Sequence, residues 1–173
     1  MADILLADVE IEALIIARTR LMALPHDRII DAQTAPVTAL KYLTDGLAGD
    51  DDTARAAVLA FTKAVNELCD GALRKNGRVN VSAVEAAEQG FEVLGDRFDL
   101  GGDDPLGHLR TLRNTRAKAR GLDVARIDTT VAARAAARAA KDFDTADRLH
   151  DELVAQGVQL VDSVDGASWT LVA

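Results

Sequence analysis

Apolar residues recur along most of the chain at the three-to-four-residue spacing of an amphipathic helix. Between Val9 and Ala23 this spacing predicts a helix that Pro25 ends. The same pattern predicts further helices over Val37–Leu47, Ala54–Cys69, Ser82–Leu94, Leu106–Arg120, Thr129–Phe143 and Asp144–Gln156. The last two are either continuous or separated by a restart. The residues from Asp27 to Thr34 are ambiguous.

Local signals mark where these helices begin and end. Pro36 falls in the first turn of a helix, where proline is tolerated, and the turn Gly49–Thr53 ends in residues suited to an N-cap. Ser82 with Glu85 three residues later has the pattern of a capping box. Gly121 is the expected C-terminal cap of the helix before it.

The pattern changes to a two-residue period after Gly157, which indicates β-strands. We predict a hairpin of Val158–Val161 and Ser168–Val172, joined by a turn between Asp162 and Gly166. A lone hairpin is only marginally stable, so it must pack on the preceding helix. The predicted fold is therefore mainly α: a helical bundle over residues 1–121, followed by a small α/β module, a helix plus β-hairpin, over residues 123–173.

Composition and charge refine this picture. The chain of 173 residues is 49% apolar and only 3% aromatic, which suits close-packed helices, and its net charge is −8. The charge is unevenly distributed, because residues 105–141 hold nine basic and two acidic side chains and the rest carries −15. The longest apolar runs are interrupted by acids and Asp3 stands where a signal peptide would be cationic, so we expect a cytoplasmic protein without a membrane partner.

Motifs for catalysis or cofactor binding are missing from the sequence. It has neither a glycine-rich phosphate loop nor a nucleophile elbow, and its three histidines lack metal-ligand spacing, so we predict no cofactor, no metal and no catalytic centre. The lone Cys69 is interpreted as a buried structural thiol. Arg110, Arg113 and Arg116 share a helix and form either a solvated face or a phosphate-binding one.

Spaced motifs near the end of the chain resemble a known family. They are Lys141-Asp142-Phe143, Ala146-Asp147, Asp151-Glu152-Leu153, Gly157, Leu160 with Asp162, and Gly166 to Trp169. This run resembles the C-terminal anticodon-binding end of bacterial cysteinyl-tRNA synthetases. Upstream, Gly49–Leu68 and Phe91–Gly95 are similar to the helical bundle of that family, so the resemblance spans most of Gly49–Trp169.

The resemblance implies an RNA-reading surface. Its base-contacting residues fall on Arg138, Asp147, Asp162 and Ser168 for hydrogen bonds and on Phe143 for stacking, with positive charge added by Lys141, Arg110, Arg113 and Arg116. Single-stranded loops are read by this chemistry, because splayed bases stack on aromatic rings and present polar edges. Alternatively, Phe143 and Trp169 are core residues and the two aspartates cap turns; for Trp169 we favour the core.

The chain also departs from that family. His150 stands where an arginine is usual, the last four residues are Thr170-Leu171-Val172-Ala173 instead of a basic tail, and the catalytic signatures are absent. We therefore predict a non-catalytic tRNA-binding module that assists, or derives from, tRNA aminoacylation. Its partners would be tRNA and a synthetase catalytic subunit or another tRNA-using enzyme. The alternatives are an interaction or regulatory paralogue that kept the scaffold and lost RNA binding, or one piece of a split cysteine–tRNA ligase.

Overall fold

The computed structural model describes residues 6–31, 38–163 and 166–172, with the side chains of residues 38, 161–163 and 166–168 left out. The described chain is mainly α, as predicted, and ends in a two-stranded antiparallel sheet. It forms two compact units, Met1–His108 and Leu109–Ala173, called here the N-terminal and the C-terminal unit. We predicted the boundary after Gly121, whereas this division places residues 109–121 in the C-terminal unit, where Ala117 joins the core.

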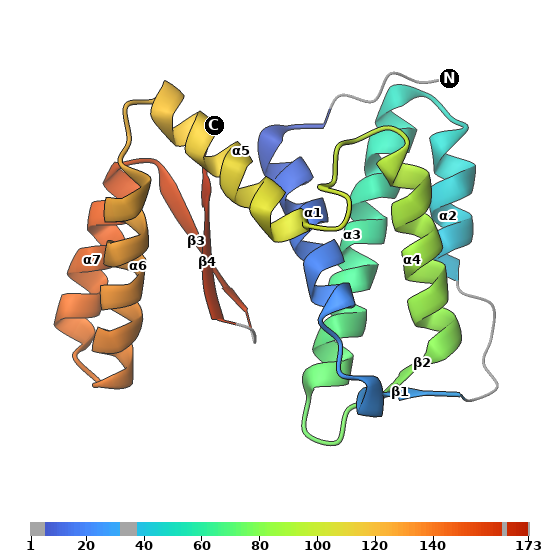
Figure 1. The fold of residues 1–173 in the computed structure, drawn as a ribbon, viewed down its shortest axis with the longest axis horizontal. Helices are drawn as coiled ribbons and strands as arrows, with labels where there is room; N and C mark the ends of the chain where they lie inside the picture. Colours follow the sequence, from blue (N-terminus) through green and yellow to red (C-terminus); the bar gives the residue numbers. More distant parts are fainter. Residues whose placement is uncertain (1–5, 32–37, 164–165, 173) are drawn as a thin grey trace. The chain divides into compact units, whose positions relative to one another are not determined.

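The described residues of the N-terminal unit contain four complete helices, which are labelled in Figure 1. They are α1 (Asp8–Met22), α2 (Thr38–Leu47), α3 (Asp51–Leu73) and α4 (Val81–Gly95). The ambiguous segment after α1 forms a short 3-10 turn, His26–Arg28, and a two-residue strand β1 (Ile29–Ile30). This strand pairs in parallel with β2 (Val79–Asn80), which immediately precedes α4.

Hydrogen bonds at the helix ends explain the bounds of α3 and α4. The side chain of Asp50 accepts from the Thr53 amide at 2.8 Å, so α3 begins three residues before the predicted Ala54. The predicted capping box is wrong, because the N-cap of α4 is Asn80, whose side-chain oxygen accepts from both the amide and the hydroxyl of Ser82 at 2.9 Å.

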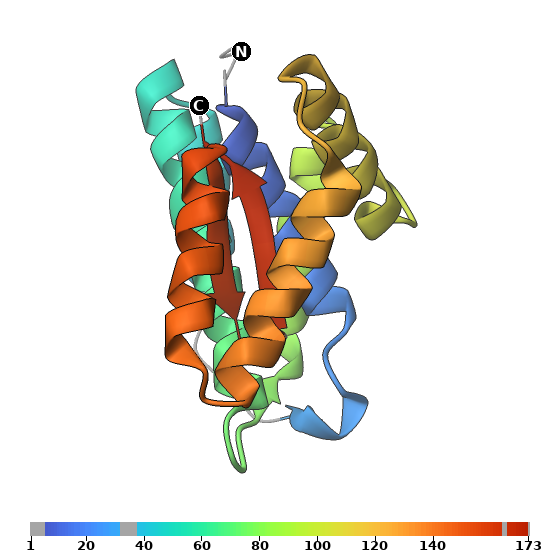
Figure 2. The ribbon, with the colours of Figure 1, turned by 90° about the vertical axis from the view of Figure 1, so that its left-hand side faces the viewer.

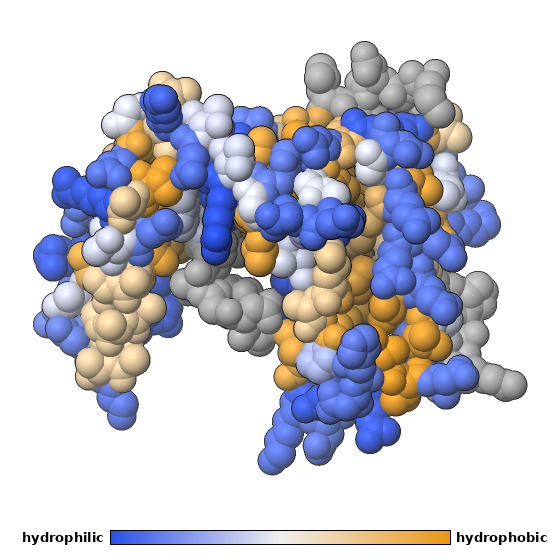
Figure 3. All heavy atoms as spheres, in the orientation of Figure 1, coloured by the Kyte–Doolittle hydropathy of each residue, from blue (hydrophilic) through white to orange (hydrophobic). Residues whose placement is uncertain are grey.

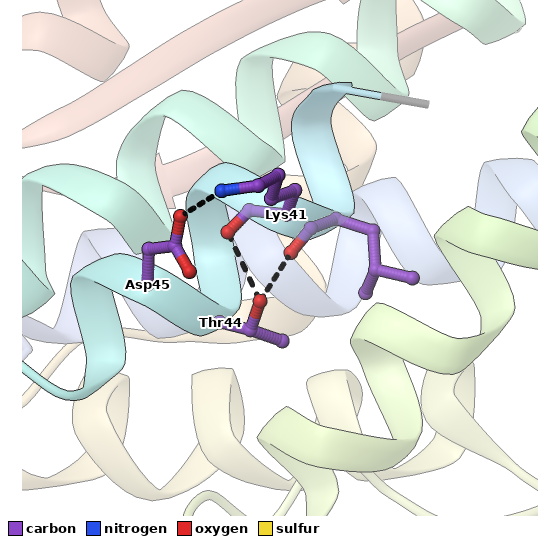
Figure 4. Close-up of polar contacts among 4 residues, drawn as sticks. Lys41, Thr44 and Asp45 are labelled. Carbon is purple, nitrogen blue, oxygen red and sulfur yellow. Dashed lines mark hydrogen bonds and ion pairs between the residues drawn. The ribbon is translucent and has the colours of Figure 1, made fainter. Parts of the chain in front are cut away.

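Polar side chains on α2 stabilise the helix locally (Figure 4). Lys41 donates to Asp45 one turn later at 2.7 Å, and the Thr44 hydroxyl donates to the backbone carbonyls of Leu40 and Lys41. The carboxylate of Asp45 raises the pKa of Lys41 through this hydrogen bond. Both charged side chains are exposed, so this contact stabilises the α2 helix slightly and adds little to the stability of the tertiary fold.

The bundle core combines large apolar side chains with small residues that let helices approach. Phe61 on α3 is 1% exposed and meets Phe91 on α4 edge to face, with ring centroids 5.2 Å apart. Gly90 makes room for this pair, because a Cβ there would lie 2.4 Å from the Phe61 ring. The scarcity of aromatic residues thus reflects seams built from glycine and alanine, with a few rings inserted.

Three helices and a hairpin form the C-terminal unit. α5 (Pro105–Ala119) enters it at Leu109, and α6 (Val124–Ala139), α7 (Phe143–Ala155), β3 (Val158–Ser163) and β4 (Gly166–Leu171) follow. Figure 2 shows the hairpin behind the α6–α7 pair, with its strands running roughly along the two helices. One apolar cluster joins them: Ala117, Ile127, Val131, Leu153, Val158, Trp169 and Leu171. The expected packing of the hairpin on its preceding helix is confirmed.

The α6–α7 connection decides between the two predicted arrangements of these helices. Lys141 takes a left-handed backbone conformation with φ of 61°, which ends the first helix. Asp142 then caps α7 by accepting from the Thr145 amide at 3.1 Å, so the helix restarts. At its other end α6 begins at Val124, five residues before the predicted Thr129, because Asp123 accepts from the amides of Ala125 and Arg126.

Candidate nucleic-acid interface

Four of the predicted site residues gather around the turn between α6 and α7. Arg138 lies in the last turn of α6, Lys141 in the turn itself, Phe143 at the first position of α7 and Asp147 one turn further along. All four are exposed, and the exposed fraction of Phe143 is 59%. We call these four residues the α6–α7 corner. It presents a cation pair, an aromatic ring and a carboxylate on consecutive turns.

The exposure of Phe143 excludes the alternative that this ring is a core residue. An exposed phenyl ring gains little packing within the unit, so Phe143 contributes little to the stability of the fold. Trp169 behaves in the opposite way: it is 5% exposed and belongs to the apolar cluster of the unit, as we favoured.

Asp142 fixes how the corner is presented. Its carboxylate accepts from Thr145, and these hydrogen bonds hold the pKa of Asp142 below its ordinary value. The carboxylate also faces the positive end of the α7 dipole, which favours the ionised form. Asp142 caps α7. Asp147 lies inside that helix and takes no part in capping it.

Asp162 and Ser168 lie on the two strands of the hairpin. The backbone of Asp162 pairs with Ala167 and that of Ser168 with Val161, but their side chains fall outside the described residues. Figures 1 and 2 both show the α6–α7 turn and the turn-proximal end of the hairpin at the same end of the C-terminal unit. The two groups of predicted contacts therefore share one end of the module.

The three arginines of α5 are not presented alike. Arg110 is exposed, Arg116 is half-buried, and Arg113 is 9% exposed with its guanidinium carbon 5.0 Å from the centroid of the Trp169 ring. The indole nitrogen of Trp169 donates to the Asp128 carboxylate at 2.7 Å. Arg113, Trp169 and Asp128 thus join α5, β4 and α6 in one stacked and hydrogen-bonded group.

Positive charge in the C-terminal unit is concentrated in the part of the chain up to Lys141. Residues 109–141 hold nine basic and two acidic side chains, while residues 142–173 hold one basic and seven acidic ones. Both acids of the first group have structural roles, because Asp123 caps α6 and Asp128 accepts from Trp169. Sequence reasoning missed these roles, although two acids isolated in a basic segment were the signal that could have revealed them.

Some of these cations are engaged within the unit. Arg126 pairs with Glu152 at 2.8 Å, and Arg120 donates to the carbonyl of Val172.

Within the residues that the structure describes, no three His, Cys, Asp or Glu side chains are grouped to hold a metal ion. Over the same residues, no helix combines the length and apolarity needed to cross a bilayer.

Known proteins resemble this chain over more than half of its length. A cysteine–tRNA ligase of Anaeromyxobacter dehalogenans (strain 2CP-C) is 36% identical over 125 residues, which cover 69% of this chain and 26% of the ligase. That of Nitratidesulfovibrio vulgaris is 32% identical over 131 residues, covering 71% and 26%, and that of Acidovorax ebreus 42% over 93 residues, covering 54% and 19%. No family model matches the chain.

These matches support a module derived from an aminoacyl-tRNA synthetase. The matched region spans about a fifth to a quarter of the length of these relatives. The chain is similar to cysteine–tRNA ligases over 54–71% of its own length, which is consistent with a C-terminal domain of those ligases and confirms the resemblance predicted from the motifs around Lys141–Trp169.

Proposed function

We propose that the chain binds tRNA through the α6–α7 corner as a non-catalytic anticodon-binding module. The observation that carries the proposal is the 59% exposed Phe143, flanked by exposed Arg138, Lys141 and Asp147, in a domain related to cysteine–tRNA ligases. A ring, two cations and a carboxylate on adjacent turns supply stacking, phosphate neutralisation and base-edge recognition together.

Each corner residue has a distinct task in this proposal. Phe143 stacks on an unpaired base, a contact worth about 1–3 kcal/mol per base. Asp147 accepts from an exocyclic amine, Arg138 donates to a base acceptor or a phosphate, and Lys141 neutralises a phosphate. Asp162 and Ser168 add hydrogen bonds from the hairpin. Their backbone positions at the same end of the unit support this assignment.

The α5 arginines divide between two tasks. Arg110 and Arg116, exposed and half-buried, extend the cationic surface toward the tRNA stem. Arg113 is buried against Trp169, so its task is to position β4 and α6. The partner protein of such a module would be a synthetase catalytic subunit or another enzyme that uses tRNA.

Titration of fluorescently labelled tRNA at about 50 mM and about 200 mM salt tests this function. Phe143→Ala should weaken binding by about tenfold, which corresponds to about 1.4 kcal/mol of lost stacking. Its matched control is Val154→Ala, an apolar residue of α7 that is 53% exposed and lies outside the corner. Arg138→Ala should weaken binding and reduce the salt slope by about one, whereas Lys75→Ala in the N-terminal unit should change neither.

Two results would overturn the proposal. One is a wild-type affinity for tRNA no higher than that of an unrelated protein of equal net charge. The other is an equal loss of affinity in Phe143→Ala and Val154→Ala. Purification of a defined protein partner without RNA, combined with either result, would favour the interaction paralogue instead.

A further inference from the structure

A groove runs along the N-terminal unit between α1 and α4. Its volume is about 600 Å³, within the range of binding clefts. The second halves of both helices and the loop after α4 line it, with Leu21, Met22, Phe91 and Leu100 among its apolar residues. We propose that this groove docks a cationic amphipathic helix of a partner protein, a function separate from the tRNA binding proposed for the α6–α7 corner.

The floor of the groove is apolar and well ordered by packing. Leu21, Phe91 and Leu100 are 5%, 5% and 3% exposed, and the Arg18 guanidinium donates to the Leu100 carbonyl at 3.0 Å, holding the loop against α1. Met22 on the wall remains 59% exposed. Figure 3 shows apolar surface between α1 and α4, bordered along α4 by hydrophilic side chains. A flexible thioether beside buried rings suits an apolar side chain from a partner.

The rim of the groove is acidic in an unfavourable arrangement. Glu88, Glu92 and Asp96 follow one another at intervals of four residues, so their exposed carboxylates stack along one side of α4. Like charges at this spacing repel one another, and Asp96, at the C-terminal cap, also faces the negative end of the helix dipole. Within the described residues none of the three has a hydrogen bond or ion pair, apart from backbone bonds.

Three carboxylates elsewhere in the same bundle have cations beside them. Glu10 pairs with Arg55 at 2.5 Å, Asp70 with Arg20 at 2.5 Å, and Asp45 with Lys41 at 2.7 Å. Among the described residues the three rim carboxylates have no such cation, although they stack at four-residue intervals on one helix. Such local conflicts are expected at functional sites, where a ligand supplies the missing charge.

The groove and the rim together specify the chemistry of the occupant. An amphipathic helix places apolar side chains at i, i+3 and i+4 into an apolar groove, and lysines or arginines on its flank would meet the three carboxylates. The N-terminal unit has ten basic and nineteen acidic residues, so its field attracts such a partner and repels RNA phosphates. This complementarity selects a cationic protein segment as the occupant.

A designed helical peptide of leucines and lysines, about four turns long, tests the proposal against the full chain. The double variant Glu88→Gln/Glu92→Gln should weaken peptide binding by about fivefold to tenfold. The control Asp27→Asn/Glu67→Gln removes two exposed carboxylates that have ion pairs only at 3.8 Å, and should change binding by less than about twofold. Peptide-induced amide shifts should cluster at Phe91, Gly95 and Gly102.

Each further outcome decides for or against the groove. Equal losses of peptide affinity in the two double variants would mean that binding depends on net charge alone, and would overturn the proposal. Peptide-induced amide shifts centred outside the groove would also overturn it. A concentration-dependent dimer abolished by Glu88→Gln/Glu92→Gln would identify a second copy as the occupant and likewise overturn it. The groove variant should also melt at a higher temperature than the free wild type; a lower one would refute the repulsion argument. Phe143→Ala should leave peptide binding unchanged.

Discussion

The burial of Arg113 predicts that this arginine supports the C-terminal unit rather than contacting RNA. In Arg113→Ala the guanidinium that lies 5.0 Å from the Trp169 ring centroid is removed, together with the aliphatic stem of a side chain that is largely buried. Trp169 then keeps its hydrogen bond to Asp128 but loses the group stacked on its face. We expect the unit to lose stability while the exposed cationic surface stays in place.

The size of the loss follows from three contributions. A desolvated cation–π contact is worth about 2 kcal/mol, and Arg113 is only 9% exposed. Two buried methylenes add about 1.6 kcal/mol. Release of the ordered arginine side chain returns about 1.5–2 kcal/mol of entropy, which cancels the methylene contribution. The net destabilisation is therefore about 2 kcal/mol, or a fall in melting temperature on the order of 10 °C for a unit of this size.

Tryptophan fluorescence measures this effect in the relevant unit, because Trp169 is the only tryptophan of the chain. The variant Arg113→Ala is compared in thermal melts with Arg110→Ala. Arg110 is the exposed arginine one turn earlier, so both variants remove the same charge from the same helix. Arg110→Ala should lower stability by less than about 0.5 kcal/mol. The same two variants are then compared for tRNA affinity below both melting temperatures.

Equal melting temperatures for the two variants would refute the structural role of Arg113. A loss of tRNA affinity in Arg113→Ala at unchanged stability would refute it more directly, because it would mean that the guanidinium reaches the RNA.

Two further predictions concern a helix cap and a helix seam. The lowered pKa of Asp142 contributes stability that is present above the ordinary aspartate value of 3.8 and is lost as pH falls through the folded-state pKa. Thermal melts at neutral pH and below pH 3.8 should therefore show a smaller loss of stability on acidification in Asp142→Asn than in the wild type, because asparagine still accepts from Thr145 but does not titrate. An identical pH profile for the two proteins would contradict this. In urea unfolding, Gly90→Ala should lower the free energy of unfolding by about 1–3 kcal/mol, because its Cβ would meet the Phe61 ring. Gly71→Ala, which has open space around it in α3, should raise the free energy of unfolding by up to about 1 kcal/mol. Similar midpoints for these two alanine variants would show that the seam can relax.

Local periodicity was enough to predict the helices and the hairpin, because each signal lies within a few residues of the element it predicts. The capping of α4 failed for a non-local reason. Asn80 and Ser82 are equally suited to an N-cap, and the choice falls on Asn80 because β2 pairs with β1, about fifty residues earlier in the chain, and holds the preceding backbone extended. The sequence has no local mark of that pairing.

Helix geometry explains why spacing alone misjudged the α5 arginines. At 3.6 residues per turn, three residues advance by about 300°, so Arg110 and Arg116 diverge by about 120° with Arg113 between them. Arg113 therefore takes the centre of the face, and that centre is turned to Trp169, as buried Ala117 one turn later also shows. The residues of the α6–α7 corner follow one another closely along the chain, so helix geometry alone places them on neighbouring turns.

The left-handed backbone of Lys141 has a consequence for anyone who would redesign this module for stability. At φ of 61° glycine is favoured and a lysine carries strain. A search guided by folding free energy alone would choose glycine there and would delete the only cation in the α6–α7 turn, together with the phosphate contact proposed for it. Thermal robustness and RNA affinity thus compete for a single residue, and engineering that improves one at this position should be expected to degrade the other.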